Sequence, residues 1–276
     1  MKRIISVLFI WAFIVTVCSG ENLQTYIGTK APGVAKEVGD IVFNDGSATP
    51  YTEDLSLTDA QKVAAIAVIY YKGTDFNNSG DTTTIRTLGV GLKHDTSGIA
   101  WCLETADAYD KDIEAIGCVG GNREQSYLYT GDRNGSDNFE VIATFKGVND
   151  TEIETNYPAF YFAKNYKNQK IGSETSSRII SGSEFENGWY LPSIPELDWI
   201  YECMYGSVKR LNIDAIIELC GGDKFDSNWY WSSNQAGISP MICLKCAFGI
   251  YFGDGCCYDC YRFVNERSVC AIREFN

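Results

Sequence analysis

The chain has 276 residues, with 36 acidic against 23 basic side chains and a formal net charge of −13. Such a charge repels nucleic acid and anionic membrane surfaces, so we expect neither as a partner. The single histidine, His94, excludes a His-rich metal site, and its polar setting in GLKHDTSG predicts an exposed side chain. The length is ample for a sizeable core and is compatible with one large domain.

The first twenty residues read as a secretory signal peptide. Lys2 and Arg3 precede an apolar run over residues 4–17, and the small residues Ser19 and Gly20 follow it. A basic start, a short apolar stretch and small residues at a cleavage point are typical of export signals. We therefore expect an exported protein, periplasmic, on the outer surface or secreted. Cys18 leaves a lipid anchor as the alternative route to a membrane.

Eleven cysteines then belong to an exported chain, in which disulfides persist. Cys102 with Cys118, and Cys203 with Cys220, are near enough in sequence to close loops of moderate length. Pairing does not follow from sequence alone. The alternative is that several cysteines are buried as small apolar side chains.

Residues 21–276 are expected to form a single domain. A strand is predicted at 40–43, and a capping box of Thr58 and Gln61 opens a helix that gives way to a strand near Ile66. TLGVGL and GIAWCL predict two further strands around a turn at 95–98, with Trp101 in the core.

The second half of the chain predicts three helices. One begins near Pro158, and its apolar face contains Phe160, Ala163 and Tyr166. The next begins at a capping box of Ser193 and Glu196. The last begins at an Asn212 cap and ends at Gly221-Gly222. These segments predict scaffold and carry no chemistry of their own.

Three landmarks, GWYLPSIPELDWIY, WYWSSNQ and AIREF, carry a family resemblance, to which GIAWCL adds an early strand. Together they resemble the bacterial domain of unknown function 1566, also called the C-terminal domain of the Legionella collagen-like protein. The resemblance covers about 98–275, and the earlier residues look like an extension seen in spirochaete members. Tyr190 and Cys270 stand where the family pattern has arginines, which puts any ion pair of those arginines in doubt here. The expected frame residues are Trp101, Trp189, Pro192, Ser193, Glu196, Trp231 and Arg273.

The resemblance implies a C-type-lectin-like α+β fold, in which two helices flank a small, irregular antiparallel sheet. It also implies binding of a carbohydrate or protein ligand. One alternative is an exported enzyme related to the sulfatase-modifying-factor group, although no catalytic machinery is assignable in the sequence. Another is a structural envelope protein whose cysteines form cross-links. We expect a binding protein and not an enzyme.

Metal sites are weak in this sequence. Calcium has two loop candidates, which are Asp75, Asn77 and Asp81 in one loop, and Asp132, Asn134 and Asp137 in the other. Neither spacing matches an EF-hand. Cys243, Cys246, Cys257 and Cys260 have the spacing of a zinc ribbon. A two-residue turn at Asp254-Gly255 would set Phe252 opposite Cys257 and point Cys257 and Cys260 to opposite faces, which disfavours zinc.

The same hairpin predicts a ligand-binding surface. Phe248, Ile250 and Phe252 should lie on its buried face, and Tyr251, Tyr258 and Arg262 on its exposed face. Exposed tyrosine with arginine is typical of binding surfaces. Asn234, in the segment after Trp231, completes the expected site. The alternative is a solvated edge hairpin without a ligand.

Residues 236–263 have an unusual composition. Five of these 28 residues are Cys, and Trp, Gln and Glu are absent. All except Met241 and Lys245 are encodable by codons of the type that adenine-directed mutagenesis of asparagine codons produces. Lectin-like targets of diversity-generating retroelements carry their variable segment just before the closing strand. We therefore hypothesise that this segment tolerates or undergoes diversification.

Overall fold

The structure is a computed structural model that describes residues 25–78, 80–119, 129–148, 152–171, 180, 182–206, 211–236, 245–261 and 267–276, with the backbone alone over 258–261. It combines two β-sheets with short helices, which confirms the predicted α+β class. The signal-peptide region, Cys18, Cys243 and Arg262 lie outside the described residues.

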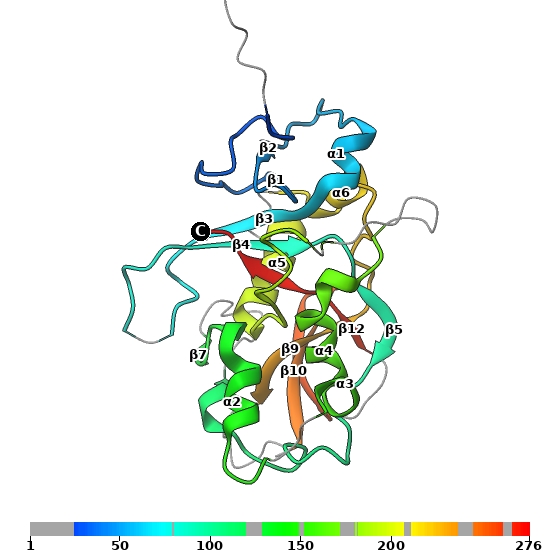
Figure 1. Ribbon diagram of the computed structural model, residues 1–276. Coiled ribbons are helices and arrows are strands. Elements are labelled where there is room, and N and C mark those ends of the chain that lie inside the picture. The colour runs from blue at the N-terminus through cyan, green and yellow to red at the C-terminus, as the bar shows by residue number, and fades with distance from the viewer. Residues whose placement is uncertain are drawn as a thin grey trace, which may run out of the picture.

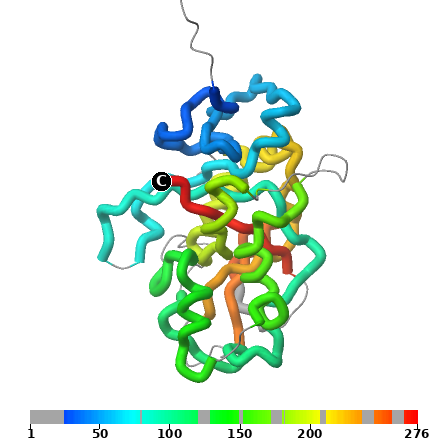
Figure 2. Tube along the Cα trace, in the orientation of Figure 1, coloured from blue at the N-terminus to red at the C-terminus, as the bar shows by residue number. Residues whose placement is uncertain are grey.

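The first sheet has six strands in the order β2-β1-β3-β4-β13-β8, all paired antiparallel. The C-terminal strand runs through the middle of the molecule, between strands from distant parts of the chain (Figures 1 and 2). The strands are β1 (Asp40–Phe43), β2 (Ala48–Pro50), β3 (Ala65–Gly73), β4 (Arg86–Gly91), β8 (Trp189–Tyr190) and β13 (Ile272–Glu274).

The second sheet has the order β11-β10-β9-β12-β5, with β6 and β7 added beside β9. Strand β9 pairs parallel with both β12 and β6, so this sheet is mixed and not purely antiparallel as expected. Its strands are β5 (Asp95–Ile99), β6 (Gly117–Val119), β7 (Thr130–Gly131), β9 (Trp229–Ala236), β10 (Cys246–Tyr251), β11 (Cys256–Tyr261) and β12 (Arg267–Val269).

The helices are short. They are α1 (Asp59–Ala64), α2 (Asn138–Thr144), α3 (Ile153–Asn156), α4 (Pro158–Lys164), α5 (Ile194–Met204) and α6 (Ile213–Leu219), with 3-10 turns η1 (Glu114–Ile116), η3 (Gly135–Asp137) and η4 (Tyr166–Asn168). Both predicted capping boxes and the Asn212 cap are present. The capping hydrogen bonds satisfy backbone N–H groups that have no partner inside the helix.

Helix α5 is the central helix of the molecule, in contact with β3 of one sheet and with β9 and β10 of the other. Ten of its 11 residues are buried, so it joins the two sheets instead of flanking one (Figure 1). Helix α6 packs on α5 and on β3. The lectin-like expectation of two helices beside one small sheet therefore describes only part of this architecture.

The N-terminal extension is an integral part of the first sheet. Strand β4 pairs with β13, whose Ile272 lies opposite Val90, so the two ends of the described chain share one layer. Gly91 permits the ring of Tyr166 to cross β4, because a Cβ at this position would lie 2.4 Å from Tyr166 Cζ. Removing the extension would leave β13 without one of its two partner strands.

Two local predictions were wrong. The expected turn at 95–98 is strand β5, and Trp101 follows that strand instead of lying within it. His94 is 1% exposed and packs against Phe225, with ring centroids 4.0 Å apart. Burial lowers the pKa of His94 to about 4, so the ring is neutral at neutral pH. The residues next to His94 in sequence are polar and predicted exposure, whereas its neighbours in the fold are aromatic rings.

The hairpin register also differs from the expected one. Tyr251 pairs with Cys256 and Ile250 with Cys257, so the connection has four residues and not two. Gly255 adopts a φ of +76°, and a Cβ there would meet the ring of Tyr201 at 2.2 Å. A shift of two residues leaves the faces unchanged, because side chains alternate along a strand with period two.

The described cysteines form no disulfide, so neither suggested pair, Cys102 with Cys118 nor Cys203 with Cys220, is joined. All four side chains are buried, which matches the alternative of cysteines as small apolar residues. Across the described ranges, no helix has both the length and the apolar character needed to cross a membrane.

Candidate functional site

Two tryptophans of the expected frame lock the second sheet to the segment after β5. Trp101 donates its indole N–H to the carbonyl oxygen of Ser232 at 2.8 Å, and Trp231 donates to that of Ile99, also at 2.8 Å. Both indoles are fully buried. A buried indole needs an acceptor for its single donor, and each segment supplies it to the other.

A buried ion pair connects the first sheet to α5. Arg86 at the start of β4 lies 2.9 Å from the carboxylate of Glu196, and it donates to the hydroxyl of Tyr190 at 2.7 Å. The other Glu196 oxygen accepts the backbone N–H groups of Ser193 at 2.8 Å and Gly135 at 3.1 Å. Tyr190 stands where the family pattern has an arginine, so an ion pair of that arginine was in doubt. Arg86, which was not predicted from the sequence, supplies a cation here.

Asn234 belongs to a second buried network, and its prediction as a ligand contact is corrected. The side chain is 0% exposed, accepts the N–H of Ile194 at 2.6 Å and donates to the carboxylate of Asp132 at 2.7 Å. Asn138 donates to the same carboxylate oxygen at 2.7 Å and to Ser233 at 2.8 Å. A ligand cannot reach Asn234 while β9 is in place, so this residue is structural.

Asp132 should make the stability of the fold depend on pH. Burial raises its pKa from 3.8 to about 6, against the lowering effect of its amide donors. The folded state therefore holds this proton more tightly than the unfolded state. Stability is lost as pH rises from about 4 to about 6, by on the order of 3 kcal/mol.

The measurement is urea unfolding of the wild type and Asp132→Asn at pH 4, 5, 6 and 7. The free energy of unfolding of the wild type minus that of the variant should fall across this pH range, because the variant lacks the titrating carboxyl. A difference that stays constant with pH would contradict the raised pKa. Comparing the two proteins cancels the titration of the other acids.

The face of the hairpin that was predicted to be exposed is largely buried, because Ala247 and Gly249 lie on it. Its half-buried residue Tyr251 packs against the half-buried Trp229 of β9, with ring centroids 5.4 Å apart, and the buried Arg267 of β12 lies 4.3 Å from the centre of the Trp229 ring. Tyr258 lies opposite Gly249 in the register, on the same face as Tyr251. The side chain of Tyr258 and all of Arg262 lie outside the described residues. The buried face is as predicted for Ile250 and Phe252, whereas Phe248 is only half-buried.

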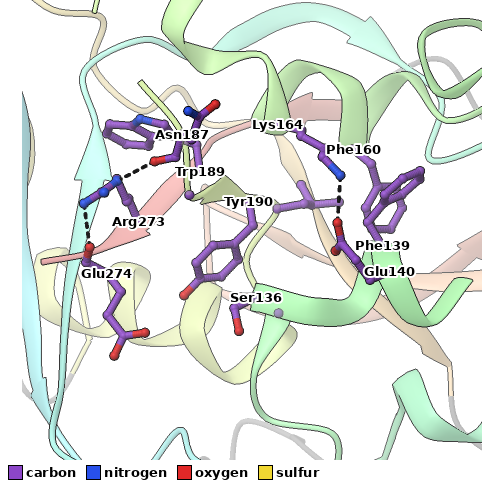
Figure 3. Close-up of a pocket in the computed structure, with 13 residues that line it drawn as sticks. Ser136, Phe139, Glu140, Phe160, Lys164, Asn187, Trp189, Tyr190, Arg273 and Glu274 are labelled. Carbon is purple, nitrogen blue, oxygen red and sulfur yellow. Dashed lines mark hydrogen bonds and ion pairs between the residues drawn. The ribbon is translucent and has the colours of Figure 1, made fainter. Parts of the chain in front are cut away.

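A cleft of about 470 Å³ opens on another side of the frame, where β8, β13, α2 and α4 meet (Figure 3). Lys164 pairs with Glu140 at 2.7 Å along one side, and Arg273 and Glu274 lie on the other, with Tyr190 between them. Each side of the cleft therefore carries one positive and one negative side chain. These provide hydrogen-bond donors and acceptors, but their charges cancel, so the cleft does not favour an anion or a cation.

Arg273, an expected frame residue, lines this cleft and a neighbouring one of about 530 Å³. It donates to the carbonyl oxygens of Asn187 at 2.7 Å and Glu274 at 2.8 Å, and stacks between Phe185 and Phe275. Among the other frame residues, Trp189 donates its indole N–H to the carbonyl oxygen of Phe185, and the carbonyl oxygen of Pro192 accepts the N–H of Ser233. Arg273 is therefore both a frame residue and a cleft residue.

Several of the metal candidates already form hydrogen bonds within the fold, among them Asp132, which accepts from Asn234 of β9. Asp81 accepts three bonds from Thr83 and Thr84, and Asn134 caps η3 through the N–H of Ser136. In the described part of the chain, no three His, Cys, Asp or Glu side chains converge as a metal site. Of the zinc-ribbon cysteines, Cys246 is buried and Cys257 lies 3.1 Å from the Tyr129 hydroxyl.

Comparisons with known proteins give one structural neighbour for this geometry. A fimbrial protein from Bacteroides ovatus, solved as a crystal structure, is similar with a TM-score of 0.53 and 16% identity. The match covers 86% of this chain and 48% of that chain, so this protein spans about half the length of its neighbour. No family model matches the sequence. No curated protein matches it either. At this identity, the likeness concerns the fold alone.

Proposed function

We propose that this protein is an exported binding protein displayed at the cell surface, with the Tyr251 face of the β10–β11 hairpin as its ligand-binding surface. The carrying observation is the half-exposed pair of Tyr251 and Trp229, with the buried guanidinium of Arg267 stacked on the Trp229 ring. Aromatic rings held by a sheet offer a large contact area at little entropy cost. The ligand is a carbohydrate or a protein at the cell exterior and not nucleic acid, and a lipid anchor at Cys18 is the one alternative link to a membrane.

Family and fold ancestry belong to the same proposal. The landmarks around Trp189, Trp231 and Arg273 support membership of the domain-1566 group and a C-type-lectin-like origin. The described neighbour is a fimbrial protein, and a fold shared with it is compatible with surface display. One alternative is an enzyme of sulfatase-modifying-factor ancestry, which turnover of a substrate would favour. The other is a cross-linked envelope protein, which a ladder of disulfide-linked oligomers on a non-reducing gel would favour.

Burial limits which positions within 236–263 can vary under the hypothesis of diversification. Cys246, Ala247, Ile250 and Phe252 are buried, and substitution there would disturb the core. Tolerated variation is therefore expected at half-exposed positions such as Tyr251, Cys256 and Cys257. Close paralogues that vary mainly at buried positions, or a locus without a template repeat and reverse transcriptase, would count against it.

Binding should be lost when side chains on the Tyr251 face of the hairpin are truncated. The experiment screens the wild type on a glycan array and against extracellular proteins, then retests hits with Tyr251→Ala, Tyr258→Ala and Arg262→Ala. Removing one anchor of a binding surface typically costs more than about 1 kcal/mol, or at least about fivefold in affinity. Isothermal titration of the purified proteins measures that change.

Tyr51→Ala is the matched control, because Tyr51 is also half-buried but directly follows β2 at the edge of the first sheet, whereas the hairpin belongs to the second sheet. It should bind like the wild type. Equal affinity in all three hairpin variants would remove the hairpin from the proposed site.

A further inference from the structure

A small cavity of about 200 Å³ lies under the first turns of α5 and shares no lining residue with the cleft of Figure 3. Three distant segments form it: the loop after β3, the residues on either side of β7, and α5 itself. The lining residues are Asp75, Phe76, Tyr129, Arg133, Pro195, Asp198 and Trp199. None of the predicted ligand-binding residues is among them.

Arg133 is fixed at its backbone but not at its charged end. Its N–H donates to Asn78 at 3.0 Å, and its carbonyl accepts from Ser193 at 2.8 Å. Its Nε is buried and makes no hydrogen bond within the described part of the chain. A guanidinium has five N–H donors, and leaving a buried donor without an acceptor costs about 1–3 kcal/mol. A ligand oxygen is the partner that the protein does not supply.

The walls of the cavity divide into an apolar side and a polar side. Trp199 is half-buried, and its ring meets that of Phe76 edge to face, with centroids 6.0 Å apart. Pro195 extends this side. On the polar side, Asp198 and the Tyr129 hydroxyl accompany Arg133. A pyranose ring has the same division, with C–H groups on its faces and hydroxyl groups at its edge.

Charge and size narrow the ligand further. Two carboxylates and one guanidinium line the cavity, which disfavours an acidic ligand, and together they offer both acceptors and donors to neutral hydroxyl groups. The volume lies below the roughly 300–1,000 Å³ of pockets for drug-sized molecules, so a single ring fits and an extended chain does not. Carboxylates and arginine can each hydrogen-bond two neighbouring hydroxyls.

We propose that this cavity binds one ring of a neutral carbohydrate, with Arg133 and Asp198 on its hydroxyls and Trp199 against its face. The inference rests on the proposed binding function and adds a second site on α5. Cys257 of β11 lies 3.1 Å from the Tyr129 hydroxyl, so the cavity adjoins the hairpin without sharing its Tyr251 face.

Saturation-transfer NMR and titration calorimetry test the proposal with neutral hexoses (glucose, galactose, mannose and N-acetylglucosamine), and with glucuronic acid and glucosamine as charged probes. The wild type should bind at least one neutral hexose better than both charged sugars. Arg133→Ala and Trp199→Leu should each weaken that binding at least about tenfold. Arg133→Lys, which keeps the charge but not the planar fork, should fall between.

Lys164→Ala in the cleft of Figure 3 and Tyr251→Ala on the hairpin are the controls, and both should bind the hexose unchanged. Unfolding midpoints of all variants confirm that each protein is folded. The inference is overturned if no neutral hexose binds the wild type, if a charged sugar binds better, or if folded Arg133→Ala binds equally well. Loss of binding in Tyr251→Ala alone would support the hairpin proposal and reject this one.

Discussion

Replacing Glu196 by alanine should cost the protein about 3–5 kcal/mol, the largest effect expected of a single substitution here. The carboxylate is fully buried and faces Arg86, whose side chain is 4% exposed. Removing it leaves the buried guanidinium with Glu274 at 3.7 Å as its remaining counter-charge, and that carboxylate is about a third exposed and therefore solvent-screened. It also takes the acceptor from the backbone N–H groups of Ser193 and Gly135. Urea unfolding monitored by tryptophan fluorescence measures the loss.

Glu218→Ala is the control, because it also breaks one ion pair, with Lys224 at 3.2 Å, but an exposed one. It should cost less than about 1 kcal/mol. Glu196→Gln combined with Arg86→Met should recover part of the loss, since no buried charge then remains. If Glu196→Ala proves as mild as Glu218→Ala, the ion pair does not hold the first sheet to α5.

Local sequence patterns were enough to predict four of the helices and several strands. Capping boxes at Thr58 and Ser193 act within four residues, and the structure has both. The α+β class follows from such short elements of mixed type. The pairing of β13 with β4 joins residues more than 180 positions apart, which no local pattern contains. The two-sheet arrangement was therefore beyond sequence reasoning.

The candidate site shows the same division. The alternation of side chains put Tyr251 and Ile250 on opposite faces of the hairpin, and this survives the two-residue register shift. Asp254-Gly255 is a strong signal for a two-residue turn, but Gly255 instead packs against Tyr201 of α5. Arg133 could not be recognised, since its cavity arises only where α5 meets two loops.

Charge at a buried position also escaped prediction. Arg86 is the first residue of β4, which is otherwise mostly apolar and contains glycine. The arginine itself is the only sign in the local sequence that a buried acidic partner exists. That partner lies 110 residues later in α5. His94 was misplaced for the converse reason, because its neighbours in sequence are polar whereas its neighbours in space are aromatic.

Asn234→Ala should destabilise the fold by about 3 kcal/mol and leave ligand binding by the folded protein unchanged. The N–H of Ile194, at the start of α5, would lose its acceptor. The buried carboxylate of Asp132 would lose one of its two amide donors. Each buried polar group left without a partner costs about 1–3 kcal/mol. Thermal and urea unfolding report the loss, and titration with a ligand of the hairpin tests binding.

Asn234→Asp sharpens the same prediction, because it keeps an acceptor for Ile194 but places a second carboxylate against Asp132. Its cost should grow as pH rises through 6, where both groups would ionise, whereas the cost of Asn234→Ala should vary much less. Asn168→Ala, at an exposed asparagine, is the control and should change stability by less than about 0.5 kcal/mol. A stable Asn234→Ala protein with weakened ligand binding would return Asn234 to the binding surface.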